Sequence, residues 1–300
     1  MAHLYAEEGL TQDQIAAALS LPKHRVIKII AQCFTRGDIT ISLLAKARPL
    51  AHLEARLCDR LDLADAIIVP IPQRSELLDS VIGRVLGEYL SGAMADGMAI
   101  GVGCGRTLAA SLASINAPQN WHLKVYALHG GPASVTSESP FHISLRLGAR
   151  LCAETYLVHA PLHAPTPHLC KILLRETINR HLWGGAVSLD LVVADVGDCS
   201  RSRSHDLLGD LGDAELASIV GAGAVGHVLG RFIDVEGVCI DHDINDRAIA
   251  MDVASVRAAG HIVLATGGTQ DERAVRAAVK ALSPAVLVTD QKMAGRLLGI

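Results

Sequence analysis

Residues 98–112 have the sequence Met-Ala-Ile-Gly-Val-Gly-Cys-Gly-Arg-Thr-Leu-Ala-Ala-Ser-Leu, with three glycines within five positions. This pattern predicts a strand, a glycine turn and a helix in succession. Glycine lacks a Cβ, so the turn can be tight and can bring the backbone close to a ligand. The first N–H groups of the helix, with Arg106 and Thr107, would then face a phosphate, a carboxylate or sugar hydroxyls. A glycine motif alone also fits a plain connection that binds no ligand.

The composition favours an α/β fold. Half of the 300 residues are hydrophobic but only 3% are aromatic, so Ala, Val, Leu and Ile must form the core, as in sheets covered by helices. This length predicts more than one domain. The apolar runs are too short for a membrane span and no signal-peptide pattern is present, so we expect a cytoplasmic protein without a membrane partner. The seven cysteines are scattered, which predicts free thiols and no metal site.

Apolar segments that alternate with helical patterns predict a parallel sheet, because alternation implies crossover connections. The predicted strands are 66–71, 98–102, 123–128, 155–158, 189–196, 262–265 and 285–289. Ligands bind such sheets beyond the carboxyl ends of the strands. Four of these ends contain glycine, so we expect a small-molecule site there. The four are Gly101–Thr107, Gly130-Gly131, Asp195–Gly197 and Gly267-Gly268.

The first part of the chain predicts two helices joined by a turn. Thr11 and Gln14 match a capping box at the start of a helix over 12–19. Pro22 suits the first turn of a second helix, and an alternating segment over 38–43 predicts the strand of a wing. A winged helix-turn-helix would set its second helix in a DNA major groove. A helical hairpin that serves as a dimerisation arm or a solvated surface is the alternative.

The charge distribution supports DNA binding by this segment. The net charge of the chain is −4, whereas residues 22–48 contain six basic residues and a single acidic residue, Asp38. Basic side chains of the second helix would contact phosphates, and His24 with its neighbours would contact base edges. The predicted DNA-binding residues are Lys23, His24, Arg25, Lys28 and Gln32.

Taken together, these motifs resemble those of the SorC-type transcriptional regulators, bacterial proteins with an N-terminal helix-turn-helix and a C-terminal sugar-sensing domain. The resemblance covers nearly the whole chain. It rests on Leu4–Ala16, Gly101–Thr107, Gly130-Gly131, Gly223–Gly226, Phe232–Gly237, Gly267-Gly268 and Val288–Asp290.

The resemblance implies a DNA-binding domain over residues 1–48 and an effector-binding domain over residues 49–300. The second domain would be Rossmann-like and similar in fold to phosphosugar isomerases. The implied partners are double-stranded operator DNA, a sugar, polyol or sugar phosphate that alters DNA binding, and further copies of the chain in a dimer or tetramer. We expect no cofactor. The ligand residues implied by the resemblance are Gly103, Gly105, Arg106, Thr107, Gly130, Gly131 and Asp234.

Differences from the family pattern guide the choice of ligand. Cys104 stands where the family has an aromatic residue, Asp195 lies at an apolar strand end, and Asp271 stands where the family often has a lysine. A lysine could balance a phosphate, whereas an aspartate would repel it by about 1 kcal/mol. We therefore hypothesise a neutral polyol or unphosphorylated sugar whose hydroxyls bind Asp195, Asp234 and Asp271, although Arg106 favours an anion.

Other functions are weighed against this hypothesis. Gly221–Gly226 fits G-x-G-x-x-G, but little room follows it for the crossover helix of a dinucleotide site. A sugar-phosphate isomerase could use Asp195, Asp234 and Asp271 as acid and base, but the basic N-terminal helices would have no role in it. Prolines separate the histidines over 159–168, which argues against a helical pair of metal ligands. We predict a regulator that is not an enzyme, with the isomerase as the alternative.

Overall fold

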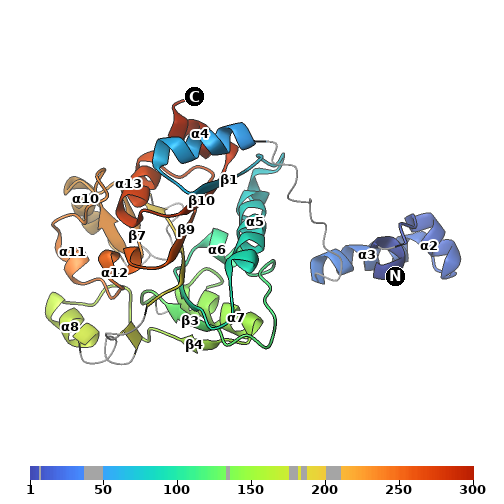
Figure 1. The fold of residues 1–300 in the computed structure, drawn as a ribbon, viewed down its shortest axis with the longest axis horizontal. Helices are drawn as coiled ribbons and strands as arrows, with labels where there is room; N and C mark the ends of the chain where they lie inside the picture. Colours follow the sequence, from blue (N-terminus) through green and yellow to red (C-terminus); the bar gives the residue numbers. More distant parts are fainter. Residues whose placement is uncertain (7, 37–49, 133–135, 176–181, 184–187, 201–210) are drawn as a thin grey trace. The chain divides into compact units, whose positions relative to one another are not determined.

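The structure of the protein is a computed structural model (Figure 1). It describes the chain apart from residues 7, 37–49, 133–135, 176–181, 184–187 and 201–210. The chain divides into two compact units, Met1–Pro49 and Leu50–Ile300, and each is described by itself. The predicted wing strand over 38–43 lies outside the described residues.

The first unit contains the helices α1 (Ala2–Ala6), α2 (Gln12–Ala18) and α3 (Lys23–Arg36). The predicted capping box begins α2, since Thr11 Oγ1 accepts a hydrogen bond from the Gln14 N–H at 3.3 Å and Gln14 Oε1 accepts one from the Thr11 N–H at 2.8 Å. Ile15 of α2 packs with Val26 and Ile30 of α3 in a small core. Val26 and Ile30 are four residues apart, so one face of α3 points inward and the opposite face is exposed.

The second unit is built on a seven-stranded parallel sheet with the order β1-β10-β9-β5-β2-β3-β4. Its strands are β1 (Asp65–Val69), β2 (Ala99–Val102), β3 (Lys124–Ala127), β4 (Glu154–Tyr156), β5 (Leu191–Asp195), β9 (His261–Ala265) and β10 (Val286–Asp290). Most are short apolar runs, as expected of parallel strands buried on both faces. The predicted α/β class with a parallel sheet is confirmed.

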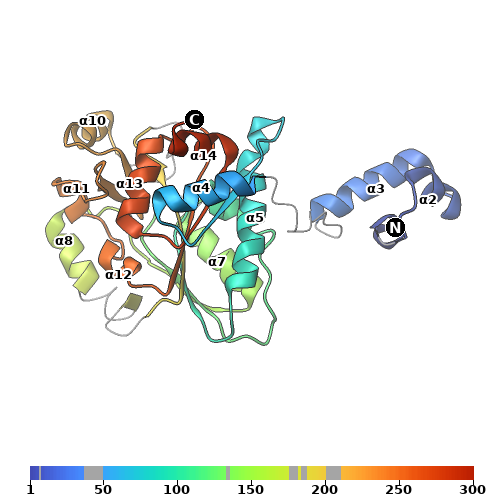
Figure 2. The same cartoon turned by 45° about the horizontal axis from the view of Figure 1, so that its top comes forward.

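Helices cover both faces of this sheet (Figures 1 and 2). On one face lie α5 (Leu78–Ala93), preceded by the 3-10 turn η1 (Ser75–Leu77), α6 (Arg106–Ser111) and α7 (Pro140–Leu151). On the other lie α4 (Ala51–Leu61), α12 (Val253–Arg257), α13 (Glu272–Leu282) and α14 (Gln291–Leu298). Alternate residues of β5 enter the two cores, with Leu191 and Val193 on the first face and Val192 and Ala194 on the second. The result is a three-layer α/β/α arrangement.

A small antiparallel sheet lies at the carboxyl end of the large one. Its strands are β6 (Gly197–Asp198), β7 (Gly226–Val228) and β8 (Arg231–Ile233). The same part of the fold contains the helices α8 (Pro167–Ile172), α10 (Asp213–Gly221) and α11 (Asp243–Asp246). The buried amide of Asn245 fixes α11 to β8, because its Oδ1 accepts from the Phe232 N–H at 2.8 Å and its Nδ2 donates to the Phe232 carbonyl at 2.9 Å. Since β6 begins two residues after β5 ends, the small sheet is held over the strand ends.

The strand order reverses between β5 and β2. From β2 the chain continues to β3 and β4 on one side, and from β5 it continues to β9 and β10 on the other. The register pairs Val102 with Val193 and Asp195 with Ala265, so these strands end close to one level. Loops that leave β2 and β5 diverge, and such a switch point forms the crevice in which open parallel sheets bind ligands.

Candidate ligand-binding site

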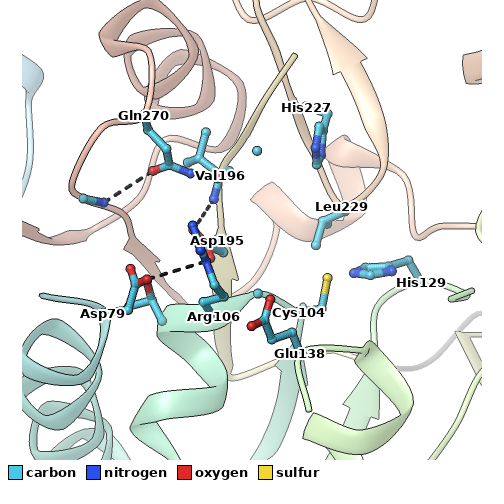
Figure 3. Close-up of a pocket in the computed structure, with 14 residues that line it drawn as sticks. Asp79, Cys104, Arg106, His129, Glu138, Asp195, Val196, His227, Leu229 and Gln270 are labelled. Atoms are coloured by element: carbon cyan, nitrogen blue, oxygen red, sulfur yellow. Dashed lines mark hydrogen bonds and ion pairs between the residues drawn. The ribbon is translucent and has the colours of Figure 1, made fainter. Parts of the chain in front are cut away.

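A cleft lies at this switch point, at the carboxyl ends of β2, β3, β5 and β9 (Figure 3). Three of the four glycine-containing strand ends singled out in the sequence contribute to its lining. The lining residues are Asp79, Cys104, Gly105, Arg106, Thr107, His129, Glu138, Asp195, Val196, Gly197, His227, Leu229, Gly267 and Gln270.

Gly105 shapes the turn after β2. Its backbone angles, φ 127° and ψ 167°, lie in a region that essentially only glycine adopts. Its N–H donates to the Glu138 carbonyl at 3.3 Å, and a Cβ at this position would overlap the carboxylate of Asp195. Glycine therefore lets the two loops approach each other across the switch point and places Arg106 and Thr107 at the start of α6.

Charged side chains of both signs surround the cleft, with carboxylates in excess. Arg106 Nε lies 3.5 Å from Asp79 Oδ2 (Figure 3). Asp195 Oδ1 accepts a hydrogen bond from the Val196 N–H at 2.7 Å, and Glu138 lines the same cleft. One arginine thus stands among three carboxylates. Ligand hydroxyls, which can donate hydrogen bonds to carboxylates, suit this lining better than a further negative charge.

Two buried histidines form another part of the lining. His129 and His227 are 1% and 3% exposed. Burial lowers the pKa of each imidazole from 6.5 to about 4, because the charged form is costly away from water. His129 Nδ1 lies 2.7 Å from the Gly130 carbonyl oxygen. Because a neutral ring must donate to a carbonyl, Nδ1 of His129 carries the proton and Nε2 keeps its lone pair.

The buried histidines make the stability of the second unit depend on pH. The unfolded chain protonates each ring near pH 6.5, whereas the folded protein does so only near pH 4. The unfolded state therefore binds more protons between these values, and the free energy of unfolding should fall as the pH drops from 6.5 towards 4, by up to about 3 kcal/mol for each histidine. Guanidinium unfolding of the wild type and of His227→Gln over this range measures the effect. The variant should show a smaller loss, and an equal loss in both proteins would contradict the assignment.

Asp290, at the end of β10, fixes the glycine loop that follows β9. Its carboxylate is fully buried and accepts hydrogen bonds from the N–H groups of Gly268 at 2.5 Å, Lys292 at 2.8 Å and Met293 at 3.1 Å. Two of these bonds cap α14, and the third holds the loop. Asp290 therefore positions one wall of the cleft without lining it.

Gln270 joins the loop after β9 to the loop after β5. Its Oε1 accepts from the Gly267 N–H at 3.4 Å, and its Nε2 donates to the Val196 carbonyl. Arg296 holds the same loop from outside, because its guanidinium donates to the carbonyls of Gln270 at 2.8 Å and Gly268 at 2.7 Å. The Gln270 amide thus serves mainly to position two walls of the cleft.

Asp234 and Asp271, which the sequence predicts to bind the ligand, do not line the cleft. Asp234 Oδ1 accepts from the N–H groups of Glu236 and Val238, both at 2.9 Å, in the turn after β8. Asp271 caps α13, and Arg273 Nη2 donates to its Oδ2 at 2.6 Å and lowers the pKa of Asp271. The pairing with Arg273 weakens the repulsion of a phosphate that we attributed to Asp271.

Gly103, Gly130 and Gly131 are likewise outside the lining. Gly103 directly follows β2, where its N–H donates to the Val193 carbonyl at 3.0 Å. Gly131 lines a neighbouring apolar cavity beside Phe141. Of the predicted ligand residues, the structure brings together Gly105, Arg106, Thr107 and Asp195.

Several lining residues were not predicted from the sequence. Asp79 lies in the first turn of α5, Glu138 precedes α7, and His227 lies in β7, so segments far apart in the chain bring them together. No local pattern distinguishes them from surface or core residues. His129 does carry a signal, because it directly precedes Gly130-Gly131 at a strand end.

The predicted DNA-binding residues lie on α3 and are exposed, and all of them except Lys23 lie away from the side of Val26 and Ile30. Lys23 Nζ also pairs with Asp13 Oδ1 at 2.8 Å. His24 and Lys28 share one helix face at i, i+4 spacing. These positions permit contact with a nucleic acid. The exposed residues are Lys23, His24, Arg25, Lys28 and Gln32.

Two other patterns are explained by the fold. Gly221–Gly226 connects α10 to β7, which pairs antiparallel with β8 rather than leading into a crossover helix. His163 Nε2 lies 3.0 Å from the Gly230 carbonyl oxygen. Among the residues that the structure describes, no group of three or more His, Cys, Asp and Glu side chains is placed to hold a metal ion. Within the same residues, no helix has the length and apolarity needed to cross a bilayer.

Comparison with known proteins places this chain among regulators. Residues 46–299 match the family model described as "Putative sugar-binding domain". The erythritol catabolism regulatory protein EryD of Brucella abortus is 24% identical, with 99% of this chain and 95% of that protein covered. The sorbitol operon regulator of Klebsiella pneumoniae is 22% identical, with 99% and 96% covered.

Solved structures share the fold. The full-length sorbitol operon regulator SorC from Klebsiella pneumoniae superposes with a TM-score of 0.75 at 21% identity, covering 99% of this chain and 96% of that one. A transcriptional regulator from Streptococcus pneumoniae gives a TM-score of 0.77 at 20% identity, covering 84% and 97%. With the family match over most of its length, this chain belongs to the SorC-type family of sugar-binding transcriptional regulators.

Proposed function

We propose that the protein is a DNA-binding transcriptional regulator whose second unit binds a neutral polyol or unphosphorylated sugar, which changes the affinity of the first unit for DNA. The observation that carries the proposal is the cleft at the switch point of a domain that belongs to a sugar-binding family. Relatives named for erythritol and sorbitol regulation support the ligand class. Because the relatives are named as regulators, a regulator is favoured over the isomerase alternative.

The lining of the cleft supports an uncharged ligand. Asp79, Glu138 and Asp195 can each accept hydrogen bonds from hydroxyls, and Arg106 can donate to a hydroxyl oxygen. The charge of Arg106 is partly balanced by Asp79 at 3.5 Å. A phosphate would therefore meet more negative than positive charge, whereas a polyol would meet acceptors on several sides.

Calorimetric titration with erythritol, sorbitol and their phosphate esters tests the ligand. We expect at least one polyol to bind, with an affinity about tenfold or more above that of its ester, which corresponds to about 1.4 kcal/mol. Asp195→Ala should abolish this binding, because it removes a carboxylate of the lining. Asp234→Ala is the matched control, since this carboxylate lies outside the cleft, and it should bind as the wild type does. Binding of the esters alone would overturn the proposed ligand class.

The exposed face of α3 supports DNA binding by the first unit. His24 and Lys28 lie near the middle of the face opposite the core, and Arg25 lies at its side. In a major groove, such a face approaches base edges, and the long basic side chains of Arg25 and Lys28 can reach the phosphates that flank them. We propose these contacts for Lys23, His24, Arg25, Lys28 and Gln32.

The double substitution Arg25→Ala, Lys28→Ala should weaken DNA binding and reduce its salt dependence. Each phosphate contact that is lost lowers the slope of log K against log salt by about 0.9. Fluorescence anisotropy with labelled DNA from upstream of the gene, over a salt series, measures both quantities. The charge-matched control is Lys124→Ala, Lys171→Ala, two exposed residues of the second unit. An unchanged slope in the α3 variant would remove these residues from the interface.

Binding to a repeated or palindromic site would require more than one copy of α3. A single helix-turn-helix buries little surface, so we propose that the protein acts as a dimer or tetramer. The ligand can shift DNA binding only if its affinity differs between two arrangements of the subunits. A regulator of this kind would act in the cytoplasm.

A further inference from the structure

We propose that His129 and His227 are the specificity-determining residues of the cleft: their imidazoles bind ligand hydroxyls and select an uncharged polyhydroxy compound over its phosphate ester. This inference rests on the proposed function, because it concerns the same cleft. Two observations support it. Both rings lie in the lining of the cleft, and each ring has a nitrogen that can form a hydrogen bond with a ligand.

The two ring nitrogens of His129 have different roles. Nδ1 is held by the Gly130 carbonyl at 2.7 Å, which fixes both the tautomer and the orientation of the ring. The distal nitrogen, Nε2, is then an acceptor. Figure 3 shows the ring pointing from the end of β3 toward Cys104 and Leu229, two other lining residues.

The ring of His227 places a polar atom, Nε2, in the wall of the cleft. Its Nε2 is buried and has no hydrogen-bond partner among the residues that the structure describes. The ring packs edge to face on Phe232, with centroids 5.5 Å apart, and lies against Gly197, where a Cβ would overlap Nε2. A buried polar atom without a partner is costly, so a ligand or water that supplies the missing hydrogen bond gains affinity from it.

The two rings also determine which ligands the cleft selects. A hydroxyl can donate to an acceptor nitrogen and accept from a donor, whereas a phosphate dianion offers only acceptor oxygens. It would therefore leave the His129 acceptor unmatched. Because burial keeps both rings neutral near pH 7, they supply no positive charge to a phosphate. With Asp79, Glu138 and Asp195 on the other walls, the cleft then accepts hydroxyls and disfavours anions.

Asparagine substitutions test these roles, because the amide nitrogen of asparagine replaces Nδ1 and the distal nitrogen is lost. His129→Asn keeps a donor for the Gly130 carbonyl, so a purely structural role predicts unchanged ligand binding. His227→Asn removes Nε2, whereas His227→Gln keeps a polar atom near its place. His168→Asn is the control, since His168 is exposed on α8 and outside the cleft. The readout is the affinity ratio between erythritol or sorbitol and the matching phosphate ester.

We expect the polyol-to-ester affinity ratio to fall about tenfold or more in His129→Asn and His227→Asn, to fall less in His227→Gln, and to stay unchanged in His168→Asn. As a second measurement, the ring 15N shifts of His129 and His227 in the wild type should move when the polyol is added. A wild type that binds a polyol, with unchanged ratios in the variants or unmoved ring shifts, would overturn this inference alone. A wild type that binds neither polyol would overturn the proposed ligand class and this inference with it.

Discussion

Replacing Gly105 with alanine is expected to abolish ligand binding. The residue has φ 127° and ψ 167°, which costs a residue with a Cβ about 1–3 kcal/mol. The new Cβ would also overlap the Asp195 carboxylate, so the loops after β2 and β5 must separate. Because Arg106, Thr107 and Asp195 would all shift, we expect polyol affinity to fall by about 100-fold or more, measured by calorimetry.

Gly103→Ala is the matched control for this prediction. Gly103 lies two residues earlier in the same glycine turn, but a Cβ there would meet its nearest neighbours at 3.4 Å or more and its φ is not positive. The substitution should change the free energy of unfolding by less than about 1 kcal/mol and leave ligand affinity intact. Equal losses in both variants would show that flexibility of the whole turn, and not the close approach at Gly105, controls binding.

Replacing Asp290 with alanine should give the largest loss of stability among the substitutions considered. Its carboxylate is fully buried and accepts three backbone N–H groups, which would all lose their partner. Each buried group without a partner costs about 1–3 kcal/mol, so we expect the free energy of unfolding to fall by about 3–4 kcal/mol in guanidinium titrations. The loop over Gly267-Gly268 should also loosen, which would weaken ligand binding.

Asp252→Ala separates this effect from ordinary helix capping. Asp252 caps α12 through the Ser255 N–H at 2.8 Å, but it is exposed, so water can replace the lost bond. Its removal should cost about 1 kcal/mol. If Asp290→Ala is no more destabilising than Asp252→Ala, the buried carboxylate does not hold the loop as we describe.

The fold could be predicted because its signals are local. The alternation of apolar strands with amphipathic helices shows a parallel sheet, and the glycine turn over 101–107 lies at a strand end where the sheet must open. The capping box at Thr11 and Gln14 likewise depends only on residues three apart. Such local patterns do not depend on contacts with distant parts of the chain.

The site could be predicted only in part, because which side chains line the cleft depends on packing between segments that are distant in sequence. The place of Asp195 in the site could be predicted, because this residue lies at the end of β5. Asp271 was assigned to the ligand although it stands directly before a helix, where aspartate commonly caps the helix. Asp234 was predicted to bind the ligand too, but its side chain closes its own turn. Nothing near His227 in the sequence indicates that β7 will carry it over the strand ends.

The most direct test of the account is the effect of polyols on DNA binding by the full chain. Fluorescence anisotropy of labelled DNA from upstream of the gene, over a salt series with and without erythritol or sorbitol, measures DNA affinity and the ligand effect together. The account predicts tight, salt-dependent binding that one polyol alters in the wild type and that no polyol alters in Gly105→Ala. DNA binding that neither polyol changes, or no DNA binding at any salt concentration, would contradict it.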